Sequence, residues 1–166
     1  MVIQEKLGHL DAFDTTGKTL DALPLEWYET NKRILHKRTA DGLQLTLKFL
    51  QESHRLHQGD VLWADDTTVI AVNILPCDCL VLQPANMADM AALCYEIGNK
   101  HLPLFYEAPD LLMPFDQPLF QLLTAQGYAV QQQQRQLIHP LRTSVTPHST
   151  NGQGSLFTKI MKLTGA

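Results

Sequence analysis

The hydrophobic pattern of the first part of the chain has the period of β-strands. Apolar and polar residues alternate over residues 43–49, as expected for a strand with one buried face. Asp41-Gly42, just before this run, is a hairpin turn signal that predicts a partner strand upstream. A second hairpin is expected over residues 61–72. Short strands at this spacing, with no helical pattern between them, predict a small all-β sandwich or open barrel.

At Pro76 the pattern changes to an alternation of strands and helices. Apolar residues recur at three- and four-residue intervals over residues 87–97, which predicts an amphipathic helix that begins after the N-cap candidate Asn86. A second helix is expected to begin after Asp116 and to end at Gly127. Short apolar strands flank and separate these helices. The resulting order, βαββαβ, is the ferredoxin-like arrangement.

Together these patterns predict an α+β protein with three segments. An all-β domain over residues 1–75 is followed by a ferredoxin-like domain over residues 76–140. The last segment, residues 141–166, is rich in Thr, Ser, Gly and Asn and is expected to be a flexible tail.

Composition and charge narrow the classes of function. The net charge of -4 and the pI near 5.9 argue against a protein that binds nucleic acid through phosphate contacts. No stretch approaches the roughly 20 apolar residues that cross a bilayer, so no membrane partner is expected. The N-terminus lacks the pattern of a signal peptide. Three cysteines, an odd number without an export signal, favour reduced thiols in the cytoplasm.

Signatures of catalysis are missing from the sequence. It contains no G-x-S-x-G, Walker A, H-E-x-x-H or G-x-G-x-x-G motif. The acidic residues are scattered and form no general acid–base pair. We therefore expect a protein that is not an enzyme, with neither catalytic residues nor residues that bind an organic cofactor.

The strongest candidate for chemistry is the corner between the first helix and the strand after it. Gly98 and Asn99 tolerate left-handed backbone and are expected to end the helix, which leaves His101 on the corner. A single histidine is most often a surface or hydrogen-bonded polar residue. A transition metal wants several donors, but a residue on a two-fold axis occurs twice at the same point. Our hypothesis is that His101 shares one metal ion with its symmetry mate.

The other candidate donors have weaker signals. His54 and His57 stand three residues apart, but they lie between strand signals, where a solvated loop is the better interpretation. Cys77 and Cys79 would point the same way on a strand and could hold a soft metal such as Cu(I) or Zn. Because no second pair accompanies them, ordinary half-buried thiols are favoured. Cys94 lies on the apolar stripe of the helix and is expected in the core.

The string Gly98-Asn99-Lys100-His101 resembles that of the UreE family of urease accessory proteins, which are nickel metallochaperones. The resemblance extends to about Pro140 and includes Trp27-Tyr28-Glu29, Asn31 to Leu35, Gly59-Asp60-Val61-Leu62, Glu96-Ile97 and Asp116. It implies a peptide-binding-like N-terminal β domain and a ferredoxin-like metal-binding domain. It also implies a homodimer through the second domain, with His101 holding nickel at the interface.

Two departures from the family pattern bear on the metal ligands. Some members carry extra histidines around the position of Asp116, where this chain has Phe115 and Gln117. Many members end in a histidine-rich tail, whereas this chain has only His139 and His148 there. His148 falls near the position at which short-tailed members keep a histidine ligand, and we carry it over as a metal ligand. His139 stands where the family usually has Glu or Gln and is a further candidate.

The resemblance implies a metallochaperone that delivers Ni²⁺ to the urease apoprotein complex during maturation of the urease active site. Its implied partners are a second copy of the chain, the urease accessory GTPase and the urease apoprotein. Imidazole also suits Zn²⁺ and Cu²⁺, so both metals can compete in vitro, and a metal-linked tetramer is left open. The alternative function is a protein-interaction adaptor whose β domain binds a peptide by strand addition, with metal binding incidental.

Overall fold

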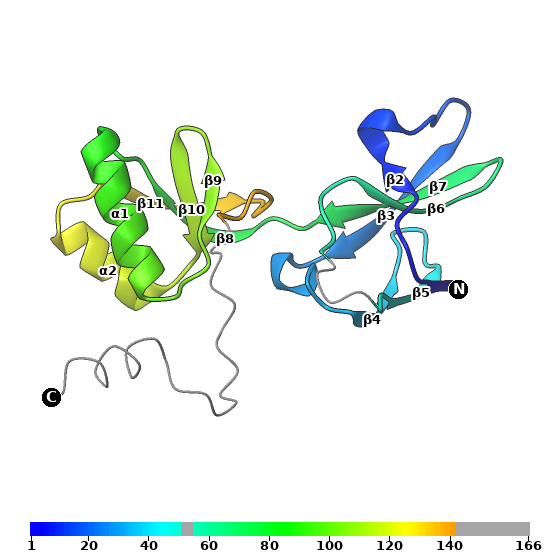
Figure 1. Ribbon diagram of the computed structural model, residues 1–166, viewed down its shortest axis with the longest axis horizontal. Helices are drawn as coiled ribbons and strands as arrows, with labels where there is room; N and C mark the ends of the chain where they lie inside the picture. Colours follow the sequence, from blue (N-terminus) through cyan, green and yellow to red (C-terminus); the bar gives the residue numbers. More distant parts are fainter. Residues whose placement is uncertain (51–54, 142–166) are drawn as a thin grey trace, which may run out of the picture.

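The computed structural model describes residues 1–50 and 55–141, and these form two lobes that are linked between β7 and β8 (Figure 1). The described part of the N-terminal lobe consists of strands and two short 3-10 helices. These elements are β1 (Val2–Ile3), β2 (Gly8–His9), η1 (Leu10–Ala12), β3 (Thr19–Leu25), η2 (Trp27–Glu29), β4 (Ile34–Arg38), β5 (Gln44–Lys48), β6 (Asp60–Ala64) and β7 (Thr68–Ile74).

Two sheets enclose the core of the N-terminal lobe. Their strand orders are β1-β5-β4 and β2-β6-β7-β3, and the alternation predicted over residues 43–49 places Leu45 and Leu47 inside. The two predicted hairpins are present as β4–β5 and β6–β7. β3 has no counterpart among the predicted strands, because Pro24 and the inward-facing Asp21 interrupt its apolar pattern. It pairs in parallel with β7.

The C-terminal lobe has the predicted βαββαβ order, which confirms the fold class. Its strands form one antiparallel sheet with the order β11-β8-β10-β9, and both α-helices of the described chain lie on one face of that sheet (Figure 1). The elements are β8 (Cys77–Leu82), α1 (Met87–Asn99), β9 (Phe105–Glu107), β10 (Asp110–Pro114), α2 (Gln117–Ala125) and β11 (Val130–Arg135).

Each face of this sheet has its own apolar cluster. The larger cluster lies between the sheet and the helices and includes Leu80, Leu82 and Ile97. The smaller cluster lies on the helix-free face and receives Trp27 from the N-terminal lobe, whose ring centroid is 5.8 Å from that of Phe105. Within the described residues, no helix is long and apolar enough to cross a membrane.

Candidate metal centre

His101 lies just beyond α1, where the chain turns toward β9. The helix starts at Asn86, whose side-chain oxygen accepts a hydrogen bond from the Asp89 N–H at 2.9 Å. Its apolar stripe buries Leu93 and Ile97 against the sheet. Because this packing fixes the helix axis, it also fixes where the end of the helix, and with it His101, emerges.

The end of α1 is a Schellman motif. The His101 N–H donates to the Gly98 carbonyl at 3.0 Å, and the Leu102 N–H reaches the Ile97 carbonyl at 3.5 Å. Leu102 packs against the same core as Ile97, which is the apolar contact that usually accompanies this motif. As expected, the helix ends at Asn99, but the left-handed residue that follows it is His101 rather than Gly98 or Asn99.

His101 itself occupies the left-handed position of this motif. Its φ is 55°, and no other non-glycine residue within 1–50 and 55–141 has a positive φ. A residue with a Cβ is destabilised by about 1–2 kcal/mol in this conformation, so glycine is the usual occupant. The side chain of His101 is exposed and gains no buried contact in return. Strain of this kind persists mainly at functional sites, so the backbone itself marks this position.

An exposed imidazole on a rigid corner can bind a transition metal but cannot hold it alone. Neutral imidazole nitrogen suits Ni, Cu and Zn, each of which takes several donors. Among the residues that the structure describes, no three His, Cys, Asp or Glu side chains gather into a metal-binding group. A site at His101 therefore needs donors from a second copy of the chain or from residues outside the described ranges 1–50 and 55–141.

His139 lies on the segment that follows β11. Its backbone carbonyl accepts a hydrogen bond from the Tyr106 N–H at 2.8 Å, so this segment extends the sheet beyond β9. The residue also lines a hollow of about 320 Å³ together with Phe105, Glu107 and Arg135. The pairing places His139 beside Tyr106. Tyr106 follows His101 by five residues in the sequence.

The base of the C-terminal tail is anchored near His101. The Leu141 N–H donates to the Leu104 carbonyl at 2.8 Å, three residues from His101. His148 lies outside the described residues, as does His54.

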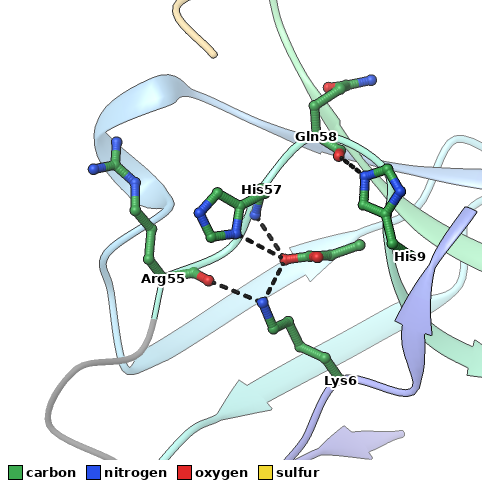
Figure 2. A network of polar contacts seen from close by, with 6 residues as sticks. Lys6, His9, Arg55, His57 and Gln58 are labelled. Atoms are coloured by element: carbon green, nitrogen blue, oxygen red, sulfur yellow. Dashed lines mark hydrogen bonds and ion pairs between the residues drawn. The ribbon is translucent and has the colours of Figure 1, made fainter. Parts of the chain in front are cut away.

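The described histidines near the start of β6 are tied into local structure (Figure 2). The carboxylate of Asp60 accepts hydrogen bonds from the Lys6 ammonium at 2.9 Å and from the backbone N–H of His57 at 2.7 Å. Burial lowers the pKa of His57 below its ordinary value, although Asp60 opposes this. His9 Nε2 lies 2.8 Å from the carbonyl oxygen of Gln58. As predicted, His57 belongs to a loop, where it faces one carboxylate.

The cysteine side chains divide between the two faces of the C-terminal sheet. Cys77 and Cys79 lie on the helix-free face with their Sγ atoms 3.7 Å apart, and Cys79 is fully buried. Cys94 packs half-buried against the core beneath the helices. The sequence predicted a shared face for the first two thiols. It gave no signal that they converge, because convergence depends on their rotamers.

Two models of one protein family together match most of the chain. The model described as UreE urease accessory protein, N-terminal domain, matches residues 3–75, and its C-terminal domain counterpart matches residues 77–153. The chain belongs to the UreE family. Membership in a family of urease accessory proteins supports a role in urease maturation.

Curated relatives agree over most of the chain. The urease accessory protein UreE of Flavobacterium johnsoniae is 42% identical over 163 residues, which cover 98% of this chain and 99% of the relative. UreE of Haemophilus influenzae strain PittEE is 40% identical over 147 residues, or 86% of this chain and 80% of the relative. UreE of Acetivibrio thermocellus is 36% identical over 141 residues, or 85% and 92% of the two chains.

Proposed function

We propose that this chain is a nickel metallochaperone for urease maturation. Two copies form a dimer through their C-terminal lobes, and the two His101 side chains share one Ni²⁺ on the two-fold axis. The dimer passes this ion to the urease apoprotein complex, with the urease accessory GTPase as a partner. Membership in a family of accessory proteins supports a carrier role rather than a catalytic one.

The observation that carries the proposal is the backbone of His101. A left-handed position at a helix end favours glycine, yet here an exposed imidazole occupies it. A site with few ligands on an exposed surface also suits a carrier, because the ion must leave again. Structural zinc sites instead enclose the metal with four fixed donors.

Nickel titration of the purified full-length chain tests the proposal. We expect one Ni²⁺ per dimer for the wild type, and for His101→Gly a loss of roughly a hundredfold or more in affinity, since even outer-shell changes alter metal affinity by about 10–100-fold. His36→Ala is the matched control, because His36 is another exposed histidine and its ring hydrogen-bonds to Thr46 Oγ1 at 3.0 Å. Unchanged nickel affinity in His101→Gly would overturn the proposal. A wild type that binds no nickel would favour the adaptor function.

The tail and His139 are proposed as secondary ligands. His148→Ala should weaken nickel binding by less than His101→Gly does, because a ligand on the tail is supplementary to the two shared imidazoles. His139→Ala tests the other candidate, and its effect on folding should be small because the backbone makes the Tyr106 contact. Calorimetry on a chain that ends at residue 141 checks the tail. Unchanged affinity and stoichiometry there would exclude His148.

We also propose that the lobes are independent domains divided at Leu75–Pro76, with residues 76–140 responsible for metal binding and dimerisation. Residues 1–75 then provide the partner-binding domain. Proteolysis under native conditions should cut near this link before it cuts within either lobe. Fragments that begin at several sites inside β8 would contradict the division.

A further inference from the structure

The helix-free face of the C-terminal sheet carries a converging thiol pair that the nickel proposal does not use. Cys77 and Cys79 are the first and third residues of β8, so both side chains leave the strand on the same side. Their Sγ atoms are 3.7 Å apart. Side chains two apart on a strand need not approach each other, so this distance reflects rotamers that turn both sulfurs toward one point.

That separation is contact between two reduced sulfur atoms. A disulfide would instead need about 2.05 Å between them. The two thiols therefore face one point without a bond between them, and a small rotation of their side chains is enough to place both on one ion.

We propose that Cys77 and Cys79 form a binding site for Cu(I), separate from the histidine site for nickel. Thiolates are soft ligands that select Cu(I) over harder ions. The described residues offer no group of three His, Cys, Asp or Glu donors here, which disfavours a closed tetrahedral zinc site. Cu(I) differs in that two thiolate ligands are enough to hold it.

Charge and proton balance follow from the surroundings of the pair. Two thiols release two protons as Cu(I) binds, so the bound centre carries one negative charge. The Cys79 thiol donates to the backbone carbonyl of Arg135 at 3.5 Å. The guanidinium of Arg135 is paired with Glu107 at 2.6 Å.

Burial makes the site selective for ions with a very high affinity for thiolate. It raises the pKa of Cys79 to about 12, and Cys77 adds to the rise. The pKa of Cys77 is also raised, by burial and by the charges of Glu26 and Asp78, against a hydrogen bond from Cys79 that lowers it. Cys77 is partly exposed and provides the entry point.

Competitive titration with Cu(I) under anaerobic, reducing conditions tests the proposal, with bicinchoninate as the competing chelator. We expect one Cu(I) per full-length chain, and a loss of roughly a hundredfold or more in affinity for Cys77→Ser. Cys94→Ser is the matched control, because Cys94 is a half-buried thiol of the same lobe. His101→Gly should also keep its Cu(I), which separates this site from the nickel site.

Two further measurements keep the test decisive. Thermal unfolding of each metal-free variant shows whether the serine substitution has disturbed the fold. If Cys77→Ser unfolds, X-ray absorption of the wild-type Cu(I) complex decides the question. A copper environment of two sulfur atoms supports the proposal, whereas nitrogen ligation overturns it. Retention of full Cu(I) affinity by a folded Cys77→Ser would also overturn it.

Discussion

The two helices of the C-terminal lobe end in the same motif, but a different residue occupies the left-handed position in each. At the end of α2 that residue is Gly127, with a φ of 83°, and at the end of α1 it is His101, with a φ of 55°. After α2 the Gly127 N–H donates to the Thr124 carbonyl at 3.0 Å and the Tyr128 N–H to the Leu123 carbonyl at 3.1 Å. Both pairs of hydrogen bonds follow the Schellman pattern.

The two helix ends show which residue the left-handed position favours on structural grounds. A Cβ added at Gly127 would meet no atom within 4 Å, so the preference for glycine there is conformational rather than steric. By the same physics a glycine would suit position 101 better than histidine does. The helix end does not require the imidazole of His101, and this supports the proposed role of the side chain in metal binding.

Exchanging His101 and Gly127 should give the largest of the predicted effects, a loss of nickel affinity. In His101→Gly/Gly127→His each motif keeps its geometry, and the strain moves from one helix end to the other. We expect overall stability within about 1 kcal/mol of the wild type, since one left-handed non-glycine residue is traded for another. Nickel affinity should nevertheless fall by roughly a hundredfold or more, because the imidazole leaves the corner of α1. Calorimetric titration measures this affinity. Wild-type nickel affinity in the exchanged variant would contradict the assignment of the metal to His101.

Gly127→Ala should destabilise the C-terminal lobe by about 1–2 kcal/mol, the penalty for a Cβ in left-handed backbone. Far-UV circular dichroism during urea unfolding measures this effect, because both α-helices of the described residues lie in this lobe. Nickel affinity is the internal control and should not change. A neutral substitution would show that the backbone relaxes around the Cβ, and the argument from strain at His101 would lose its basis.

His101→Gly should stabilise the same lobe, by about 0.5–1 kcal/mol. The gain is smaller than the strain of about 1–2 kcal/mol because glycine also raises the entropy of the unfolded chain. His101→Asn provides the matched variant, since asparagine tolerates left-handed backbone better than most residues. The urea midpoint should rank Gly above Asn and Asn above His. Destabilisation by glycine would mean that the imidazole stabilises the fold after all.

The smallest predicted effect concerns acid and the N-terminal lobe. Burial holds the pKa of His57 below its ordinary value, so the unfolded chain binds more protons than the folded one as pH falls through about 6.5. Stability of this lobe should therefore decrease from pH 7 to pH 5, and less so in His57→Gln. Tryptophan fluorescence reports it, because Trp27 and Trp63 are both there.

The same acid titration separates the histidine of the loop from the histidine of the helix end. Imidazole must be neutral to bind metal, so acid should release nickel in the wild type. His57→Gln should leave that release unchanged while it flattens the stability curve. If acid no longer released nickel from His57→Gln, the metal would depend on the N-terminal lobe. That result would contradict the assignment of the metal to His101.

Much of the architecture follows from local patterns in the sequence. A period of two or of 3.6 residues is set by backbone geometry, so the hairpins at residues 34–48 and 60–74 and the βαββαβ order were predictable. So were the helix starts at Asn86 and Asp116, because a side chain that accepts the N–H three residues on is a local device. His101 was identified from its place between a helix and a strand and from the resemblance to the UreE family.

Tertiary packing decided the details that matter most for the candidate sites. The sequence predicted the end of α1 at Gly98 and Asn99 and assigned left-handed backbone to these residues. The helix does end at Asn99, but packing of Ile97 and Leu102 into the shared core leaves the left-handed position to His101. The Cys77–Cys79 distance likewise depends on rotamers chosen by surrounding atoms. Local periodicity determines which elements form, whereas long-range contacts determine where each element stops and which way its side chains turn.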